Sequence, residues 1–196
     1  MPGKREEKRE ALRKALISSA VKQIDAGGST ALRARDLAKE AGCALGAIYT
    51  HFEDLEELAF FAKAEIYRRM DLELTKVMDA VADESPRVQM NCLASSYFGF
   101  AVENANLWQA IFAENAVAED RVPEWYRNSL VTLMSHISRP LHELRPDLDD
   151  AALALRTRTI FSAIHGIVLL ALQKRPSGVP LDDVPSAMEQ VVEAFS

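Results

Sequence analysis

Strand signals are almost absent from this chain of 196 residues. No stretch alternates apolar and polar residues over the length of a strand, and no Asn-Gly pair marks a β-hairpin. Apolar residues recur instead at helical spacing, which predicts an all-α protein. Asp54, with Glu57 three residues later, predicts a helix N-cap. We expect about nine helices, at residues 5–26, 34–41, 45–51, 54–82, 86–103, 105–117, 123–144, 149–174 and 182–195.

Cysteines are few, and long apolar runs are missing. Cys43 and Cys92 stand alone in apolar segments without the spacing of metal ligands, so we expect reduced core thiols and no metal site. No uncharged apolar run reaches the roughly 18 residues of a transmembrane helix. The charged N-terminus is unlike a secretory signal. The sequence therefore favours a cytoplasmic protein with no membrane partner.

Motifs of catalysis are missing as well. The chain has no His-x-x-x-His or Glu-x-x-His metal spacing, no Gly-rich phosphate loop and no nucleophile elbow. We therefore expect a protein that is not an enzyme and needs no cofactor, with an all-helical enzyme as an alternative.

Positive charge is scarce overall but concentrated at one end. The net charge of −6 combines ten basic and six acidic residues in 1–52 with thirteen basic and twenty-three acidic residues in 53–196. A basic front on an acidic body approaches a polyanion such as DNA in one orientation only.

Two short helical segments meet at Gly42. Glycine ends a helix at low cost because it adopts the left-handed conformation freely. A helix of about eight residues is unstable alone, but two packed across a tight turn between long helices are stable. This is the helix-turn-helix arrangement, whose second helix enters the DNA major groove. Its apolar positions are Leu37, Ala38, Ala41, Leu45, Ile48 and Phe52.

The same region carries a group of motifs: Arg35-Asp36-Leu37-Ala38, Ala41-Gly42, Gly46-Ala47-Ile48-Tyr49-Thr50-His51-Phe52 and Glu56-Glu57-Leu58. With them, residues 9–60 resemble the DNA-binding domain of the tetracycline-repressor (TetR) family of bacterial transcription regulators. The resemblance implies a three-helix DNA-binding domain at 9–60, with its motif at 33–52. It also implies a helical effector-binding and dimerisation domain at 61–196.

The C-terminal part is similar to the branch of that family with a WHG-type domain. The similarity rests on Leu107-Trp108-Gln109-Ala110-Ile111-Phe112, Val122-Pro123-Glu124-Trp125-Tyr126 and Ala163-Ile164-His165-Gly166. Ile164 stands where the branch has tryptophan.

The resemblance assigns DNA contacts to Tyr49 and His51 on phosphates and to Thr50 near base edges, with Arg35 able to reach a guanine. Arg33 replaces the usual Thr or Ser cap, and its guanidinium is expected to bind a phosphate. Leu55 replaces a lysine, which removes one phosphate ligand. A core aromatic role for Tyr49 and a helix-capping role for His51 are the alternatives. The predicted DNA-binding residues are Arg33, Arg35, Ala44, Leu45, Gly46, Ala47, Tyr49, Thr50 and His51.

The family also implies a homodimer through the last two helices, at 149–174 and 182–195, and a small-molecule effector. Helix 149–174 is apolar around much of its circumference, which indicates cover from two sides. The large aromatic residues suggest a hydrophobic or aromatic effector, with a packed core as the alternative. The predicted ligand-binding residues are Tyr97, Phe98, Trp108, Phe112, Trp125, Phe161 and His165.

Together these features predict a repressor that binds a near-palindromic, double-stranded operator and is released by its effector. A DNA-binding protein that senses no ligand is the second alternative.

Overall fold

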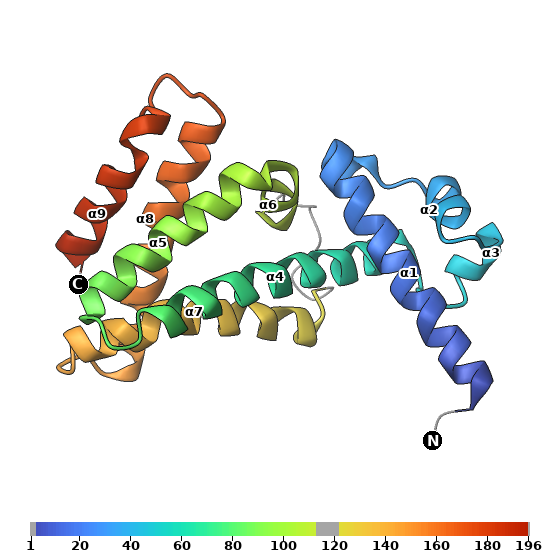
Figure 1. Cartoon of the computed structure of the whole chain (residues 1–196), viewed down its shortest axis with the longest axis horizontal. Coiled ribbons are helices and arrows are strands. Elements are labelled where there is room, and N and C mark those ends of the chain that lie inside the picture. The colour runs from blue at the N-terminus through green and yellow to red at the C-terminus, as the bar shows by residue number, and fades with distance from the viewer. Residues whose placement is uncertain (1–2, 113–121, 196) are drawn as a thin grey trace. The chain divides into compact units, whose positions relative to one another are not determined.

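The computed structural model describes residues 3–112 and 122–195, which form helices and no strands (Figure 1). The all-α prediction is confirmed. The chain divides into two compact units, one made of the described parts of 1–68 and 104–127 and the other of 69–103 and 128–195. The described helices are α1 (Lys4–Gly27), η1 (Ser29–Ala31), α2 (Ala34–Glu40), α3 (Leu45–Ile48), α4 (Leu55–Ala80), α5 (Pro86–Glu103), α6 (Ala105–Phe112), α7 (Glu124–Leu144), α8 (Asp150–Leu172), η3 (Leu181–Asp183) and α9 (Val184–Phe195).

The first unit is built around α1, which contacts both α2 and α6. Leu16 and Ala20 of α1 are fully buried, as are Leu37 of α2 and Ile48 of α3. Burial of one such aliphatic side chain stabilises a protein by about 1.5–3 kcal/mol. Each short helix is therefore anchored by its own buried residue.

The predicted turn at Gly42 is present. Gly42 has a φ of +67°, which only glycine adopts without strain. The following amide, that of Cys43, donates a hydrogen bond of 2.9 Å to the carbonyl of Ala38. This bond closes the end of α2 and directs the chain into α3.

The prediction that the second motif helix reaches residue 51 is wrong, because α3 ends at Ile48. The amides of Thr50 and His51 donate to the carbonyls of Ala47 and Ile48, three residues earlier. Such tighter bonds are common at helix termini. The segment after α3 is therefore a turn and not a further helical turn.

The start of α4 follows the predicted capping pattern. The amide of Glu57 donates to Oδ1 of Asp54 at 2.8 Å, and the Glu57 carboxylate accepts from the amide of Glu53. These bonds satisfy backbone donors that a helix start leaves open.

Most other predicted helix ends agree with the structure to within two residues. The short 3-10 helices η1 and η3 were not predicted, and η3 delays the start of α9 to Val184. Residues 113–117 of the helix predicted at 105–117 lie outside the described residues.

Helix α6 belongs to the first unit although it follows α5 in the sequence. Trp108 of α6 is fully buried, and Leu107 and Ala110 beside it are nearly so. The side-chain amide of Asn106 donates to the carbonyl of Asp25, near the end of α1, at 2.6 Å. Helix α6 is thus held against α1 by apolar burial and by this hydrogen bond.

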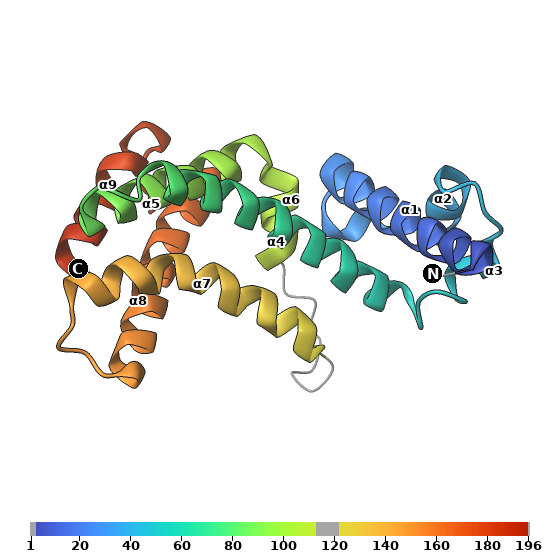
Figure 2. The same cartoon turned by 60° about the horizontal axis from the view of Figure 1, so that its bottom comes forward.

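The second unit is centred on α5, α8 and α9, which contact one another (Figure 2). Ile160 and Val168 of α8 are buried, as are Val184 and Met188 of α9. Asp149 caps α8 by accepting a hydrogen bond of 2.8 Å from the amide of Ala152.

Among the described helices, α8 alone is long and apolar enough to cross a membrane by length and composition, and 22% of its most apolar stretch is buried within the chain. One such helix is weak evidence for a membrane span, because a helix covered on two sides in a water-soluble protein has the same composition. The exposed apolar surface of α8 needs some cover.

Candidate nucleic-acid interface and sensor residues

Residues 44–51, which we name the recognition segment, present one side to solvent. Leu45 and Tyr49 are 42% and 52% exposed, whereas Ile48 between them is fully buried. The buried side anchors the segment and leaves the other side accessible, so Tyr49 is not a core residue. The exposed members of the segment are Ala44, Leu45, Gly46, Tyr49 and Thr50.

The remaining polar members of the segment differ in their surroundings. The Thr50 hydroxyl donates to the carbonyl of half-buried Ala47 at 2.7 Å, which leaves its oxygen able to accept a further bond. His51 is half-buried, and its Nδ1 is buried without a hydrogen-bond partner among the described residues. That nitrogen therefore does not cap the helix end.

The two arginines of the motif lie on the solvent side of the first unit. Arg33 precedes α2 without forming a side-chain cap. Its Nη1 instead donates to the carbonyls of Thr30 and Leu32 at 2.7 and 3.0 Å. Arg35 is exposed and forms no ion pair with another described residue. The Arg33 guanidinium is thus anchored to the preceding turn, and the Arg35 guanidinium is unpaired.

A stack of a cation and aromatic rings supports the recognition segment. The guanidinium carbon of Arg13 lies 4.0 Å from the ring centroid of Phe61 and 5.2 Å from that of Phe52. Phe61 also stacks on Trp125, with centroids 4.4 Å apart and planes at 14°. A cation–π contact contributes about 0.5–2 kcal/mol. Because Phe52 directly follows His51, this Arg13 stack holds the end of the recognition segment against α1 and α4.

A polar link joins α1 to α2. The Ser19 hydroxyl and the Lys22 ammonium donate to the two carboxylate oxygens of Glu40, at 2.6 and 2.9 Å. The bond from Ser19, and then that from Lys22, lowers the pKa of Glu40 below its ordinary value. Glu40 is thus ionised at neutral pH and fixes α2 beside α1.

The second unit brings together three of the predicted ligand-binding residues. The Tyr97 hydroxyl and Nδ1 of His165 are hydrogen-bonded at 2.7 Å. The Phe161 ring stacks on the His165 ring at 5.5 Å and meets the Tyr97 ring edge-on at 6.1 Å. Burial lowers the pKa of His165 from its ordinary value of 6.5, so the imidazole is neutral at pH 7.

The other predicted ligand-binding residues lie elsewhere. Trp108 and Phe112 contact each other on α6 of the first unit, with ring centroids 5.4 Å apart. Trp125 belongs to the Arg13 stack, and its ring also meets that of Tyr126. Phe98 lies half-buried on α5.

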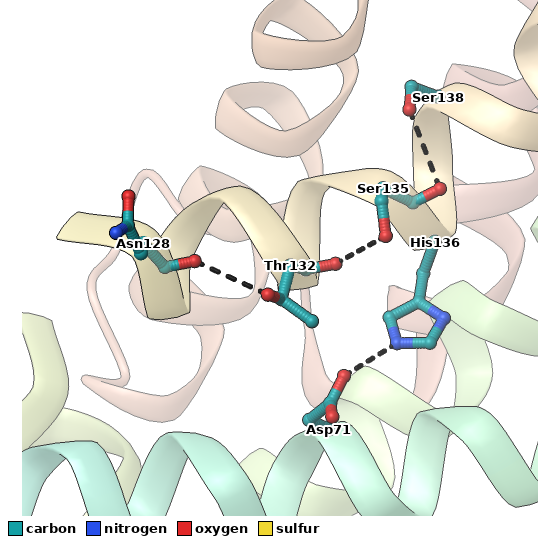
Figure 3. Close-up of polar contacts among 6 residues, drawn as sticks. All are labelled: Asp71, Asn128, Thr132, Ser135, His136 and Ser138. Atoms are coloured by element: carbon teal, nitrogen blue, oxygen red, sulfur yellow. Dashed lines mark hydrogen bonds and ion pairs between the residues drawn. The ribbon is translucent and has the colours of Figure 1, made fainter. Parts of the chain in front are cut away.

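A second polar pair in the second unit was not predicted (Figure 3). Nε2 of His136 on α7 lies 2.8 Å from Oδ1 of Asp71 on α4. His136 is 8% exposed. Figure 3 shows the His136 ring directed at Asp71, while the hydroxyls of Thr132 and Ser135 bond to carbonyls of their own helix. No sequence signal indicates this pair, because its members are 65 positions apart.

Apolar side chains remain exposed on α8. Leu155 is 66% exposed and Leu170 is 37% exposed. Only 22% of the most apolar stretch of α8 is buried within the described chain, so much of this apolar helix remains accessible.

No cluster of metal-ligating side chains occurs in the part of the chain that the structure describes. Cys43 and Cys92 are free and half-buried.

Two family sequence profiles match the chain. The profile of bacterial regulatory proteins of the tetR family matches residues 16–60. That of the tetracyclin repressor-like C-terminal domain matches residues 91–195, more than half of the chain. The chain belongs to the TetR family. It is therefore a transcriptional regulator with an N-terminal helix-turn-helix domain and a C-terminal helical domain. The WHG-type branch stays a prediction.

Solved structures share the TetR fold. A protein of unknown function from Rhodococcus sp. RHA1 superposes with a TM-score of 0.74 at 22% identity, over 92% of this chain and 93% of that one. A TetR transcriptional regulator from the same source superposes with a TM-score of 0.66 at 14% identity, over 96% of this chain and 97% of that one. The regulator FadR from Bacillus subtilis, solved with stearoyl-CoA, superposes with a TM-score of 0.68 at 18% identity, over 91% of this chain and 97% of that one. Among curated proteins no sequence matches.

The lowered pKa of His165 predicts a pH-dependent stability. Above the ordinary value of 6.5 the histidine is neutral in the folded and unfolded states. Below it the unfolded chain takes up the proton more readily, so this TetR-family protein loses stability as the pH falls. We expect the thermal midpoint of the wild type to fall more than that of His165→Gln between about pH 7 and pH 5.

Circular dichroism melting measures this difference. His142→Gln is the control, because His142 is exposed, and it should keep the pH dependence of the wild type. Parallel curves for wild type and His165→Gln would contradict the prediction.

Proposed function

We propose that this TetR-family regulator is a cytoplasmic repressor, which binds a near-palindromic operator as a homodimer and is released by a small hydrophobic or aromatic effector. The main support for this proposal is the exposure of the recognition segment: Tyr49 and Thr50 are accessible to solvent, while buried Ile48 anchors the segment. We retain 9–60 as the DNA-binding domain and 61–196 as the effector-binding and dimerisation domain.

The chemistry of the recognition segment favours phosphate contacts over base contacts. Leu45, Gly46 and Ala47 offer no side-chain hydrogen bond to a base, although Leu45 and Ala47 can contact thymine methyl groups. Tyr49 carries an exposed hydroxyl suited to a phosphate, and Arg35 carries a guanidinium suited to a phosphate or a guanine. We therefore expect phosphate contacts and DNA shape to provide most of the affinity for the operator.

His51 and Arg33 take a smaller part in this proposal than the family resemblance assigns to them. The His51 ring is half-buried beside Phe52, and the Arg33 guanidinium bonds to neighbouring carbonyls. Either side chain must contact a phosphate from these positions or change rotamer on binding. Tyr49, Thr50 and Arg35 are the strongest candidates for direct contacts.

The proposed symmetric dimer through α8 and α9 would have two effects. It covers the exposed Leu155 and Leu170 of α8. It also doubles the contacts of a small reading unit, which accounts for the near-palindromic operator.

A hydrophobic effector agrees with the aromatic cluster formed by Tyr97, Phe161 and His165. Neutral His165, hydrogen-bonded to Tyr97, offers a polar group within an apolar surrounding, as small-molecule sites commonly do. FadR, which shares the fold, was solved with stearoyl-CoA, a ligand with a long apolar chain. An effector that prefers the state with low operator affinity weakens DNA binding by linkage. We assign the transmission to α4, whose residues 55–68 belong to the first unit and 69–80 to the second.

Operator binding tests the proposal. We expect a duplex selected in vitro from a random library to bind two protomers. The slope of log K against log salt should correspond to at least about three phosphates per dimer, at about 0.9 per phosphate. Tyr49→Phe should lower the affinity roughly tenfold or more, because a hydrogen bond to a charged group is removed from each protomer. Fluorescence anisotropy at several salt concentrations measures both effects.

Val131→Ala is the control for Tyr49→Phe, because Val131 is 67% exposed and belongs to the second unit. It should leave the affinity unchanged. A salt slope of fewer than about three phosphates, or a complex with one protomer, would contradict the proposal.

The effector is tested by titration of the operator complex. Stearoyl-CoA is the first probe, and coenzyme A without an acyl chain is its control. Native mass spectrometry of the gently purified protein then identifies any other bound compound. We expect a hydrophobic ligand that binds the protein to lower operator affinity by about 5–150-fold. A ligand that binds and leaves the affinity unchanged would contradict the proposal.

A further inference from the structure

The first two turns of α1 extend beyond the core of the first unit. Leu16 is the first buried residue of this 24-residue helix, and residues 4–11 are all exposed. Figure 1 shows these dark-blue turns continuing past α2 and α3. The tetR family profile begins only at residue 16, so this extension lies outside the matched family segment.

Charge is segregated on the extension. At 3.6 residues per turn, Lys4, Arg5, Lys8 and Arg9 occupy about 140° of the helix surface. The acidic residues of the extension occupy the remaining side. They are Glu6, Glu7 and Glu10.

The basic side overlaps one edge of the face with which α1 packs on the rest of the unit. Arg5 and Arg9 lie on the same ridge as Arg13, which covers the rings of Phe52 and Phe61. Lys4 and Lys8 lie on the ridge of Leu12 and Leu16. Arg9 lies about 40° around the helix from Arg13, so the basic side borders the side of α1 that contacts Phe52, the residue directly after the recognition segment. Arg5 is about 12 Å along the helix from Arg13.

Helix stability does not account for this pattern. Lys4 and Arg5 in the first turn oppose the helix macrodipole, which Glu6 and Glu7 of the same turn complement, and no side chain caps the start of α1. The pairs Lys4–Lys8 and Arg5–Arg9 place like charges four residues apart, which is unfavourable. None of the four forms an ion pair with another described residue, whereas Lys14 on the acidic side lies 3.9 Å from Glu10. A polyanion relieves this repulsion.

We propose that Lys4, Arg5, Lys8 and Arg9 form a second DNA contact, the basic stripe, which binds backbone phosphates of the duplex held by the recognition segment. This inference rests on the proposed function. Phosphate contacts add affinity without reading the sequence. The stripe supplies charge that the apolar recognition segment lacks, and it compensates for the absence of a cation at Leu55.

The test compares the full-length wild type with a variant carrying Lys4→Gln, Arg5→Gln, Lys8→Gln and Arg9→Gln. We expect the salt slope for the selected duplex to fall by at least about 2, the equivalent of one phosphate per protomer. The affinity ratio between the selected duplex and a mixed-sequence duplex should stay within about threefold of the wild-type ratio, because phosphate binding carries no sequence information.

The matched control removes four exposed cations from the second unit, with Lys76→Gln, Arg87→Gln, Arg139→Gln and Arg175→Gln, and gives the same change in net charge. Its slope should stay close to that of the wild type. Circular dichroism of the stripe variant should show an unchanged or raised thermal midpoint, since repulsion is removed.

An unchanged slope in the stripe variant, or an equal fall in the control, overturns the inference. So does a variant that keeps its DNA affinity but loses binding to vesicles of anionic phosphatidylglycerol, because the occupant is then a membrane. If the wild type binds no duplex even at low salt, the proposed function fails as well; if it binds and only the stripe is without effect, the inference fails alone.

Discussion

The short length of α2 and α3 is the constraint on which the DNA-reading unit depends. These helices have seven and four residues, too few to be stable in water. They persist because Leu37, Ile48 and Phe52 are buried in the first unit. One side of each short helix is buried, so only the residues on the other side are accessible for contacts with DNA. The Arg13 stack extends this support to the end of the recognition segment.

The two sources of DNA affinity in this account complement each other. The recognition segment contributes close contact and few hydrogen bonds, since three of its exposed residues are Ala44, Leu45 and Gly46. The basic stripe contributes charge but no sequence information. The acidic remainder of the chain repels DNA and so favours approach through the first unit. In the proposed homodimer, specificity depends on the spacing of two copies as much as on single base contacts.

Features that local sequence determines could be predicted. Gly42 marks a turn because of its backbone freedom, and Asp54 with Glu57 marks a helix start through hydrogen bonds within one turn. The end of α3 could not be predicted, because the residues after Ile48 keep helical spacing while the backbone tightens.

Contacts between distant residues could not be predicted for a different reason: spacing along the chain does not encode which helices meet. The Asp71–His136 pair joins positions 65 apart, and Trp125 packs on Phe61 and not in the cluster of Tyr97. Aromatic content indicated an apolar site but not how its members divide between the two units.

Amide hydrogen exchange with and without a selected operator duplex is the decisive measurement for DNA binding by the recognition segment, because it examines that segment in the unmodified protein. We expect DNA to slow exchange most strongly in residues 33–52, with the largest change after Gly42. Stable DNA binding with no change of exchange in that segment would contradict it.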